Sequence, residues 1–191
     1  MLGRQKVRIG VATGRGFTLI ELMVTIAVLA VVIAVAVPSF LETISSNRLT
    51  SAGNEAAALF QLARTEALRR NQAFVVCPSP TPDGTTKDCS KVGAKGLIVY
   101  MGGTNQVMRR MTLHEGMGMT YSTGFGSQIV FRPDGFARAA DGSLVSAVVQ
   151  VCIPNATPSE NARRVSIASG SRITTQRNNL SGACPAPNDT L

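Results

Sequence analysis

The first half of the chain carries two successive helical patterns. From Leu22 to Val37 every residue is apolar apart from Thr25, and Glu21 directly before them is the only charge near this run. Counted from Phe17, the 21 residues to Val37 would form a helix of about 31 Å, close to the hydrocarbon thickness of a bilayer. This pattern predicts a transmembrane helix with one carboxylate at its start.

Beyond Pro38 the pattern becomes that of an amphipathic helix. Apolar and small residues recur at spacings of three and four, with polar residues on the opposite face. We therefore expect one long helix from Phe17 to about Arg70, interrupted but not ended at Pro38, whose second half packs on a sheet. Asn71 is a suitable residue to end it. The apolar positions are Leu49, Ala52, Ala56, Leu59, Phe60, Ala63 and Ala67.

Downstream, the period changes to that of β-strands. β-branched and aromatic runs alternate with turn sequences such as Pro133-Asp134-Gly135 and Ser169-Gly170. The sequence thus predicts an α+β protein, in which a long N-terminal helix packs on a C-terminal antiparallel β-sheet domain over residues 72–191. The predicted strands are Phe74–Cys77, Leu97–Met101, Val107–Met111, Met119–Tyr121, Ile129–Arg132, Val145–Ile153, Val165–Ala168 and Arg172–Thr175.

Charge is distributed unevenly around the apolar run. Arg4, Lys6, Arg8 and Arg15 precede it without an acidic residue, a bias that keeps an N-terminus in the cytoplasm and places the rest of the chain outside. The formal net charge is +8, but beyond residue 16 there are 15 basic and 11 acidic residues, a balance of only +4. A nucleic-acid partner therefore has to be argued from local clusters of charge.

The four cysteines, Cys77, Cys89, Cys152 and Cys184, include no C-x-x-C pair, and His114 is the only histidine. This spacing does not suit a zinc site. In an outward-facing domain we expect disulfides, for which three connectivities exist. We favour Cys77–Cys89, which would close a proline-rich loop, and Cys152–Cys184, which would tie the polar C-terminal tail to a strand.

Motifs of the common enzyme classes are missing from the sequence. It contains no G-x-S-x-G, no P-loop, no H-E-x-x-H and no calcium-loop pattern. We expect no catalytic activity, no cofactor and no bound metal.

The junction Gly16-Phe17-Thr18-Leu19-Ile20-Glu21-Leu22-Met23-Val24 resembles the class III signal of type IV pilins and type II secretion pseudopilins. The resemblance implies a pilin-like fold and a prepilin peptidase that cuts after Gly16 and methylates Phe17. Residues 1–16 would then be a removed leader, 17–37 the transmembrane helix and 38–71 the amphipathic helix. It also implies a chain first anchored in the bacterial inner membrane, with its globular domain in the periplasm, and later part of a cell-surface pilus.

Glu21 has a physical role in such a chain. After cleavage, the Phe17 ammonium and the Glu21 carboxylate lie in or near a low-dielectric region, where an unpaired charge is costly. In staggered subunits, the carboxylate of one chain can meet the ammonium of the next, and the family uses this contact in filament assembly. In the alternative, a protonated Glu21 sits in the headgroup region of a plain membrane anchor.

A cleaved secretory signal is another alternative, because Ala34-Val35-Ala36 offers a small-x-small cleavage site. However, the apolar run exceeds the roughly 7–15 residues of a signal core. The helical pattern also continues past Pro38, which favours a retained helix.

The segment 129–137, together with 164–167 and 170–173, resembles the globular domain of the FimT/FimU and type II secretion H-type branch. The resemblance implies a minor pilin that helps to start or cap a type IV pilus, with other major and minor pilins as partners. A type II secretion pseudopilin shares every one of these features. Phe131 and Phe136 flank the turn of this segment, and we expect both in the core.

FimT-like members of this branch are implicated in DNA uptake through basic residues near the C-terminus. The corresponding candidates for contact with double-stranded DNA are Arg163, Arg164, Arg172 and Arg177. The Gly-Arg-x-Arg pattern of that subfamily is replaced here by Gly170-Ser171-Arg172, and no aromatic residue lies among the arginines to stack on bases. The alternative is a basic edge that meets an acidic partner subunit.

Overall fold

The computed structural model describes residues 16–84, 87–155, 157–168 and 170–189. They belong to two compact units that meet between Phe40 and Leu41, inside the single long helix α1 (Leu19–Arg70). As expected, α1 continues through Pro38. The positively charged leader segment lies outside the described residues.

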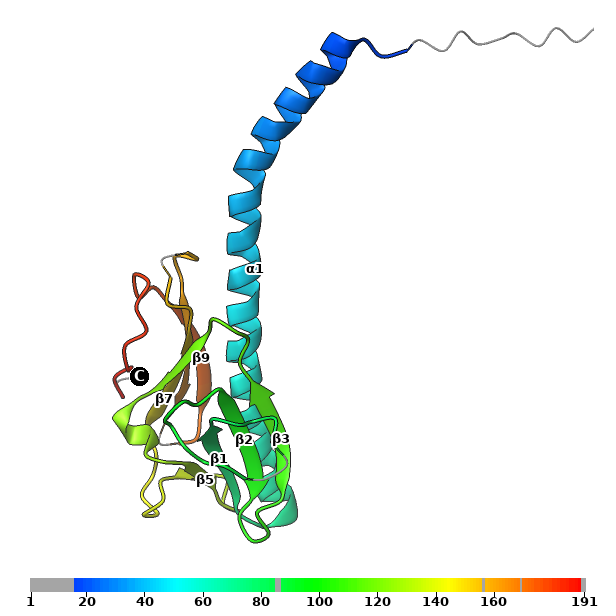
Figure 1. The fold of residues 1–191 in the computed structure, drawn as a ribbon. Coiled ribbons are helices and arrows are strands. Elements are labelled where there is room, and N and C mark those ends of the chain that lie inside the picture. Colours follow the sequence, from blue (N-terminus) through cyan, green and yellow to red (C-terminus); the bar gives the residue numbers. More distant parts are fainter. Residues whose placement is uncertain (1–15, 85–86, 156, 169, 190–191) are drawn as a thin grey trace, which may run out of the picture. The chain divides into compact units, whose positions relative to one another are not determined.

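The second half of α1 packs on the β domain through the predicted face (Figure 1). The helix ends as predicted at Asn71, whose φ of 53° is left-handed, and the Gln72 amide donates to the Ala67 carbonyl at 3.3 Å. All seven apolar positions are buried, joined by Gly53: Leu49, Ala52, Gly53, Ala56, Leu59, Phe60, Ala63 and Ala67.

The described residues of the β domain form two antiparallel sheets, whereas the sequence suggested one. Sheet A has the order β3-β2-β1-β5-β6 and sheet B the order β4-β7-β8-β9. A short 3-10 helix, η1 (Thr123–Phe125), follows β4. The strands are β1 (Phe74–Ser79), β2 (Gly96–Met101), β3 (Val107–Thr112), β4 (Gly118–Tyr121), β5 (Ile129–Phe131), β6 (Ala137–Arg138), β7 (Ala147–Cys152), β8 (Ala162–Ile167) and β9 (Ile173–Asn178).

All eight predicted strands are present, with ends shifted by at most three residues, and the α+β architecture is confirmed. The additional strand is β6, which has only two residues and pairs with β5 across the Pro133-Asp134-Gly135 turn. Gly135 closes this turn with φ 78°, and its amide donates to the Arg132 carbonyl at 2.9 Å. β8 and β9 form the expected terminal hairpin.

One core prediction is wrong. Phe131 is fully buried, but Phe136 is 41% exposed. Phe131 pairs with Ala137 across the hairpin, and neighbouring residues of a strand point to opposite faces. Since Ala137 faces the core, Phe136 has to face outward.

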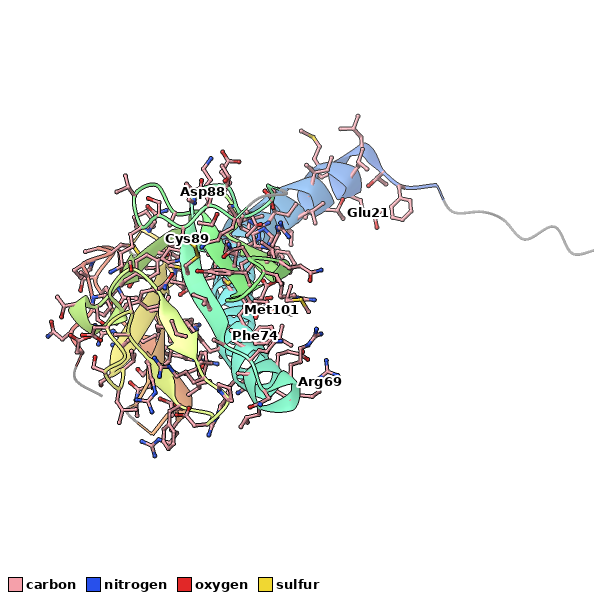
Figure 2. The ribbon with its side chains drawn as sticks, turned by 90° about the horizontal axis from the view of Figure 1, so that it is seen from below. Glu21, Arg69, Phe74, Asp88, Cys89 and Met101 are labelled. Carbon is pink, nitrogen blue, oxygen red and sulfur yellow. A yellow bond between two sulfur atoms is a disulfide. The ribbon has the colours of Figure 1, made fainter. Side chains whose placement is uncertain are left out.

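Both favoured disulfides are present, and each holds a segment on the outer face of a sheet. Cys77–Cys89 fixes the loop between β1 and β2 over sheet A, where it covers a small cluster that includes Val75 and Tyr100. Cys152–Cys184 ties the C-terminal tail to β7 of sheet B. Figure 2 labels Cys89 in the first of these segments.

The tail is held to sheet B by further polar contacts. The Pro185 carbonyl accepts hydrogen bonds from Gln150 Nε2 at 2.9 Å and from Thr120 Oγ1 at 3.1 Å. Near the end of the described chain, the Asp189 carboxylate accepts the Gly124 amide at 2.9 Å and the Thr123 hydroxyl. Gln150 is fully buried, and the hydrogen bond to Pro185 gives its Nε2 the partner that a buried polar group needs.

Candidate assembly site

Three described residues precede α1, and all are exposed: Gly16, Phe17 and Thr18. Thr18 caps the helix, because its Oγ1 accepts the Glu21 amide at 3.2 Å and its carbonyl accepts the Leu22 amide at 3.1 Å. Thr18-x-x-Glu21 is the spacing of a capping box. We missed this signal in the sequence, although it marks the start of α1 just beyond the predicted cleavage site.

Glu21 lies in the first turn of α1 (Figure 2). The unpaired amide groups at a helix start carry partial positive charge, so a carboxylate is favoured there. Within the described part of the chain, Glu21 forms no ion pair. None of the described cations therefore neutralises its carboxylate.

The apolar first half of α1 is not covered by any of the described residues. Residues 16–43 are all exposed, including Leu19 at 76% and Val35 at 74%. Thr25, the one polar residue between Leu22 and Val37, donates its hydroxyl to the Leu22 carbonyl at 2.9 Å and so has a hydrogen-bond partner within the helix. Among the described residues, α1 is the one helix long and apolar enough to cross a membrane, by length and composition.

The four arginine candidates do not form one exposed cluster. Arg163 on β8 is only 1% exposed, so it is not available to DNA phosphates. Its guanidinium donates to the carbonyls of Glu160 and Ala162 and to the hydroxyls of Ser46 and Thr50 on α1. This corrects the sequence prediction, since Arg163 joins helix and sheet inside the domain.

The other three arginines lie apart from one another. Arg164 faces the opposite side of β8, where its Nε donates to Gln150 Oε1 at 2.9 Å. Arg177 is exposed on the edge strand β9 and lies 3.5 Å from Glu160. Arg172 is exposed in the turn between β8 and β9.

Burial lowers the pKa of Arg163, and the neighbouring positive charge of Arg177 lowers it further, while Glu160 opposes the shift. The guanidinium still carries its charge at any physiological pH, because the ordinary pKa of arginine lies far above that range. Its hydrogen bonds, and not a close carboxylate, compensate for the loss of water.

No arrangement in the described residues points to metal or acid–base chemistry. Groups of three or more potential metal ligands do not occur among them. His114 is exposed and lines a cavity of about 410 Å³ beside Lys95, Glu115 and Met117. Within the described ranges, the features that stand out are the capped start of α1, a Glu21 carboxylate without an ion pair and the exposed apolar first half of the helix.

A prepilin-type N-terminus, one long apolar helix and antiparallel sheets packed on its second half define the class of pilins and pseudopilins. The sequence matches the prokaryotic N-terminal methylation motif over residues 13–37. It matches the family described as Type II transport protein GspH over residues 52–171. The chain belongs to this family.

Solved structures of two proteins share the fold. The type IV minor pilin FimU of Pseudomonas aeruginosa has 18% identity and a TM-score of 0.50, covering 73% of this chain and 94% of its own. The minor pseudopilin EpsH of the Vibrio cholerae type II secretion system has 14% identity and a TM-score of 0.50, covering 68% and 97%. No curated protein sequence matches the chain significantly.

Proposed function

We propose that this protein is a minor structural subunit of a type IV pilus. It is made as a prepilin, cut after Gly16 by prepilin peptidase and methylated at Phe17. Residues 17–37 hold it in the inner membrane with the β domain in the periplasm, until it joins other pilins in a filament. The observation that carries this proposal is a Glu21 carboxylate without an ion pair to any described residue, at the start of a helix whose apolar side chains from Leu19 to Val37 are exposed.

The assembly step follows from the cost of isolated charge. Cleavage after Gly16 creates an ammonium on Phe17, four residues from the Glu21 carboxylate. Inside a bundle of apolar helices neither charge has water, and breaking a buried ion pair costs about 3–5 kcal/mol. A staggered neighbour that supplies the opposite charge therefore sets both recruitment and register.

A type II secretion pseudopilus is the second candidate, and the description of the matched family favours it. Deletion of the gene separates the two. Loss or shortening of surface pili with normal secretion supports the pilus, and a secretion defect with normal pili supports the pseudopilus. We propose no role in DNA uptake, because the four candidate arginines do not share one exposed surface.

Glu21→Ala tests the assembly role, with Glu42→Ala as the matched control because Glu42 is also an exposed carboxylate on α1. We expect mature-length protein in membranes for both variants. In sheared filaments, the amount of the Glu21→Ala variant should fall by at least about tenfold, because a buried ion pair is lost. The amount of the Glu42→Ala variant should stay near that of wild type. Normal incorporation of Glu21→Ala would rule out the proposed pairing.

A further inference from the structure

An apolar patch lies at the end of the β domain where α1 terminates. Among the described residues from 41 onward, only five large apolar side chains are exposed. Three of them belong to this end: Leu68 at 52%, Phe136 at 41% and Leu144 at 50%. We call these three residues the end patch. Figure 2 views the domain from this end and labels Arg69 in the last turn of α1.

The fold brings the three residues of the end patch together. A Cβ on Gly135 would lie 3.2 Å from Leu68 Cδ2, so the β5–β6 turn rests directly on Leu68. Leu144 pairs with Arg138, and Phe136 lies two residues before Arg138 on the same face. Phe136 and Leu144 are therefore diagonal neighbours, close enough for large side chains to touch.

The rim of the end patch is cationic. Its three carboxylates are already engaged: Glu66 with Arg69 and Arg70, Asp134 with Arg138, and Asp141 with Ser143. The described segments at this end carry six arginines against these three carboxylates, namely Arg64, Arg69, Arg70, Arg132, Arg138 and Arg172.

Three of these arginines are left without an ionic partner. Arg64 donates to the Ser171 carbonyl at 3.0 Å, and this hydrogen bond also fixes the β8–β9 turn against α1. Arg132 and Arg172 are exposed. None of the three forms an ion pair with another described residue, so three positive charges remain for a partner.

We propose that the end patch and its arginine rim form a docking surface for an acidic, partly apolar face of a different protein. Protein interfaces commonly have an apolar centre and a polar rim, and arginine is enriched among the residues that matter most for affinity. A second copy of this chain would bring the same surplus of positive charge and be repelled. Duplex DNA would supply phosphates but no apolar surface for Leu68, Phe136 and Leu144.

This inference goes beyond the filament role of α1, because it concerns what the β domain binds. It uses no residue of the assembly site. Failure of one proposal therefore leaves the other standing.

Photocrosslinking in living cells tests the inference on the full-length protein. A benzophenone amino acid replaces Phe136, which is exposed, and in a control it replaces Val92, which is 85% exposed and lies outside the end patch. We expect a discrete adduct of Phe136 with a different protein, linked through a segment of net negative charge. The Val92 control should not give this adduct.

Charge reversal then tests the cationic rim. Arg132→Glu combined with Arg172→Glu should reduce the Phe136 adduct by about tenfold or more, because rim charges control association. The matched control, Arg109→Glu with Arg177→Glu, changes two exposed arginines on the edge strands β3 and β9 and should stay within about twofold of wild type.

Several results would overturn the inference. They are an adduct with a second copy of this chain, a partner segment without net negative charge, an adduct that survives the rim reversal, or no adduct at all. Retention of the detergent-solubilised full chain on double-stranded DNA, lost on reversal of Arg132 and Arg172, would assign the surface to nucleic acid instead. Intact disulfides in each variant exclude misfolding as the cause.

Discussion

Arg163 is the residue at which local sequence and three-dimensional structure disagree most. Its hydrogen bond to the Ser46 hydroxyl spans 117 positions of the chain, a relation that no local pattern reveals. The adjacent Arg164 looks equivalent in the sequence, yet the alternation of β8 sends the two side chains to opposite faces. A group of basic residues on one strand is therefore not one basic surface.

Arg163→Ala should destabilise the domain strongly. The variant leaves a cavity and removes the guanidinium that donates to the Ser46 and Thr50 hydroxyls, at a combined cost of about 2–4 kcal/mol. Thermal unfolding of the full chain in detergent, followed by circular dichroism, measures the effect. Arg172→Ala, on the surface, should change stability by less than about 0.5 kcal/mol. Equal losses for both variants would show that Arg163 has no special structural role.

Gly53 is the residue of α1 that packs against Arg163. A Cβ at this position would lie 2.9 Å from the Cβ of Arg163, which cannot swing away as a side-chain end could. Gly53→Ala should therefore lower the melting temperature, even though alanine favours a helix over glycine by about 1 kcal/mol. Ser51→Ala, two residues earlier on the exposed side, should keep or raise it. A stabilised Gly53→Ala would contradict the close packing of α1 on β8.

At the scale of elements, the sequence predicted most of the fold because the informative patterns are local. The switch from a period of three to four to a period of two marks the border between α1 and the strands. The buried face of α1 from Leu49 to Ala67 was correct at every predicted position. The two-residue strand β6 was missed because it is too short to show a period, and the split into two sheets depends on pairings between distant segments.

The C-terminal tail is an element with almost no apolar surface, so its anchors have to hold it. The Cys152–Cys184 disulfide joins residues with a sequence separation of 32, and the Cys77–Cys89 disulfide joins residues with a sequence separation of 12. From the entropy that each closed loop removes from the unfolded chain, Cys152–Cys184 should stabilise the fold by about 3.7 kcal/mol and Cys77–Cys89 by about 2.8 kcal/mol. Replacing Cys152 and Cys184 by serine should thus lower the melting temperature by a few degrees more than replacing the other pair. The opposite order would mean that the tail contributes little.

Asp189 makes the tail contacts dependent on pH. Partial burial alone would raise its pKa, but hydrogen bonds from Ser122, Thr123 and Gly124, together with the nearby Lys91 charge, lower it on balance. A carboxylate with a lowered pKa in the folded state stabilises that state above the unfolded pKa of about 3.9, and this contribution is lost as the pH falls through the folded pKa.

Asp189→Asn tests this pH dependence. We expect the variant to melt below wild type at pH 7, and the difference to shrink as the pH falls below about 4. Ser143 and Asp141 form a comparable exposed pair outside the tail, so Asp141→Asn serves as the control for a general loss of charge. A difference between wild type and Asp189→Asn that stays constant from pH 7 to pH 3 would mean that its charge does not hold the tail.

At the scale of the whole molecule, α1 begins with an apolar half whose described side chains are exposed, and its second half belongs to the buried core of the β domain. Since no described residue covers this first half, lipid or the helices of other subunits are the surroundings that suit it. The Gly16 to Glu21 junction could be found from sequence because its chemistry is contiguous. The end patch could not, since Leu68, Phe136 and Leu144 are brought together only by the fold.

The most direct measurement is mass spectrometry of the N-terminal peptide, from sheared surface filaments and from membranes of the same cells. A filament subunit processed by prepilin peptidase should begin at methylated Phe17 in the sheared fraction. A soluble chain that begins at Val37, after cleavage behind Ala36, would instead show an ordinary secreted domain. The roles proposed for Glu21 and for the apolar half of α1 would then be excluded.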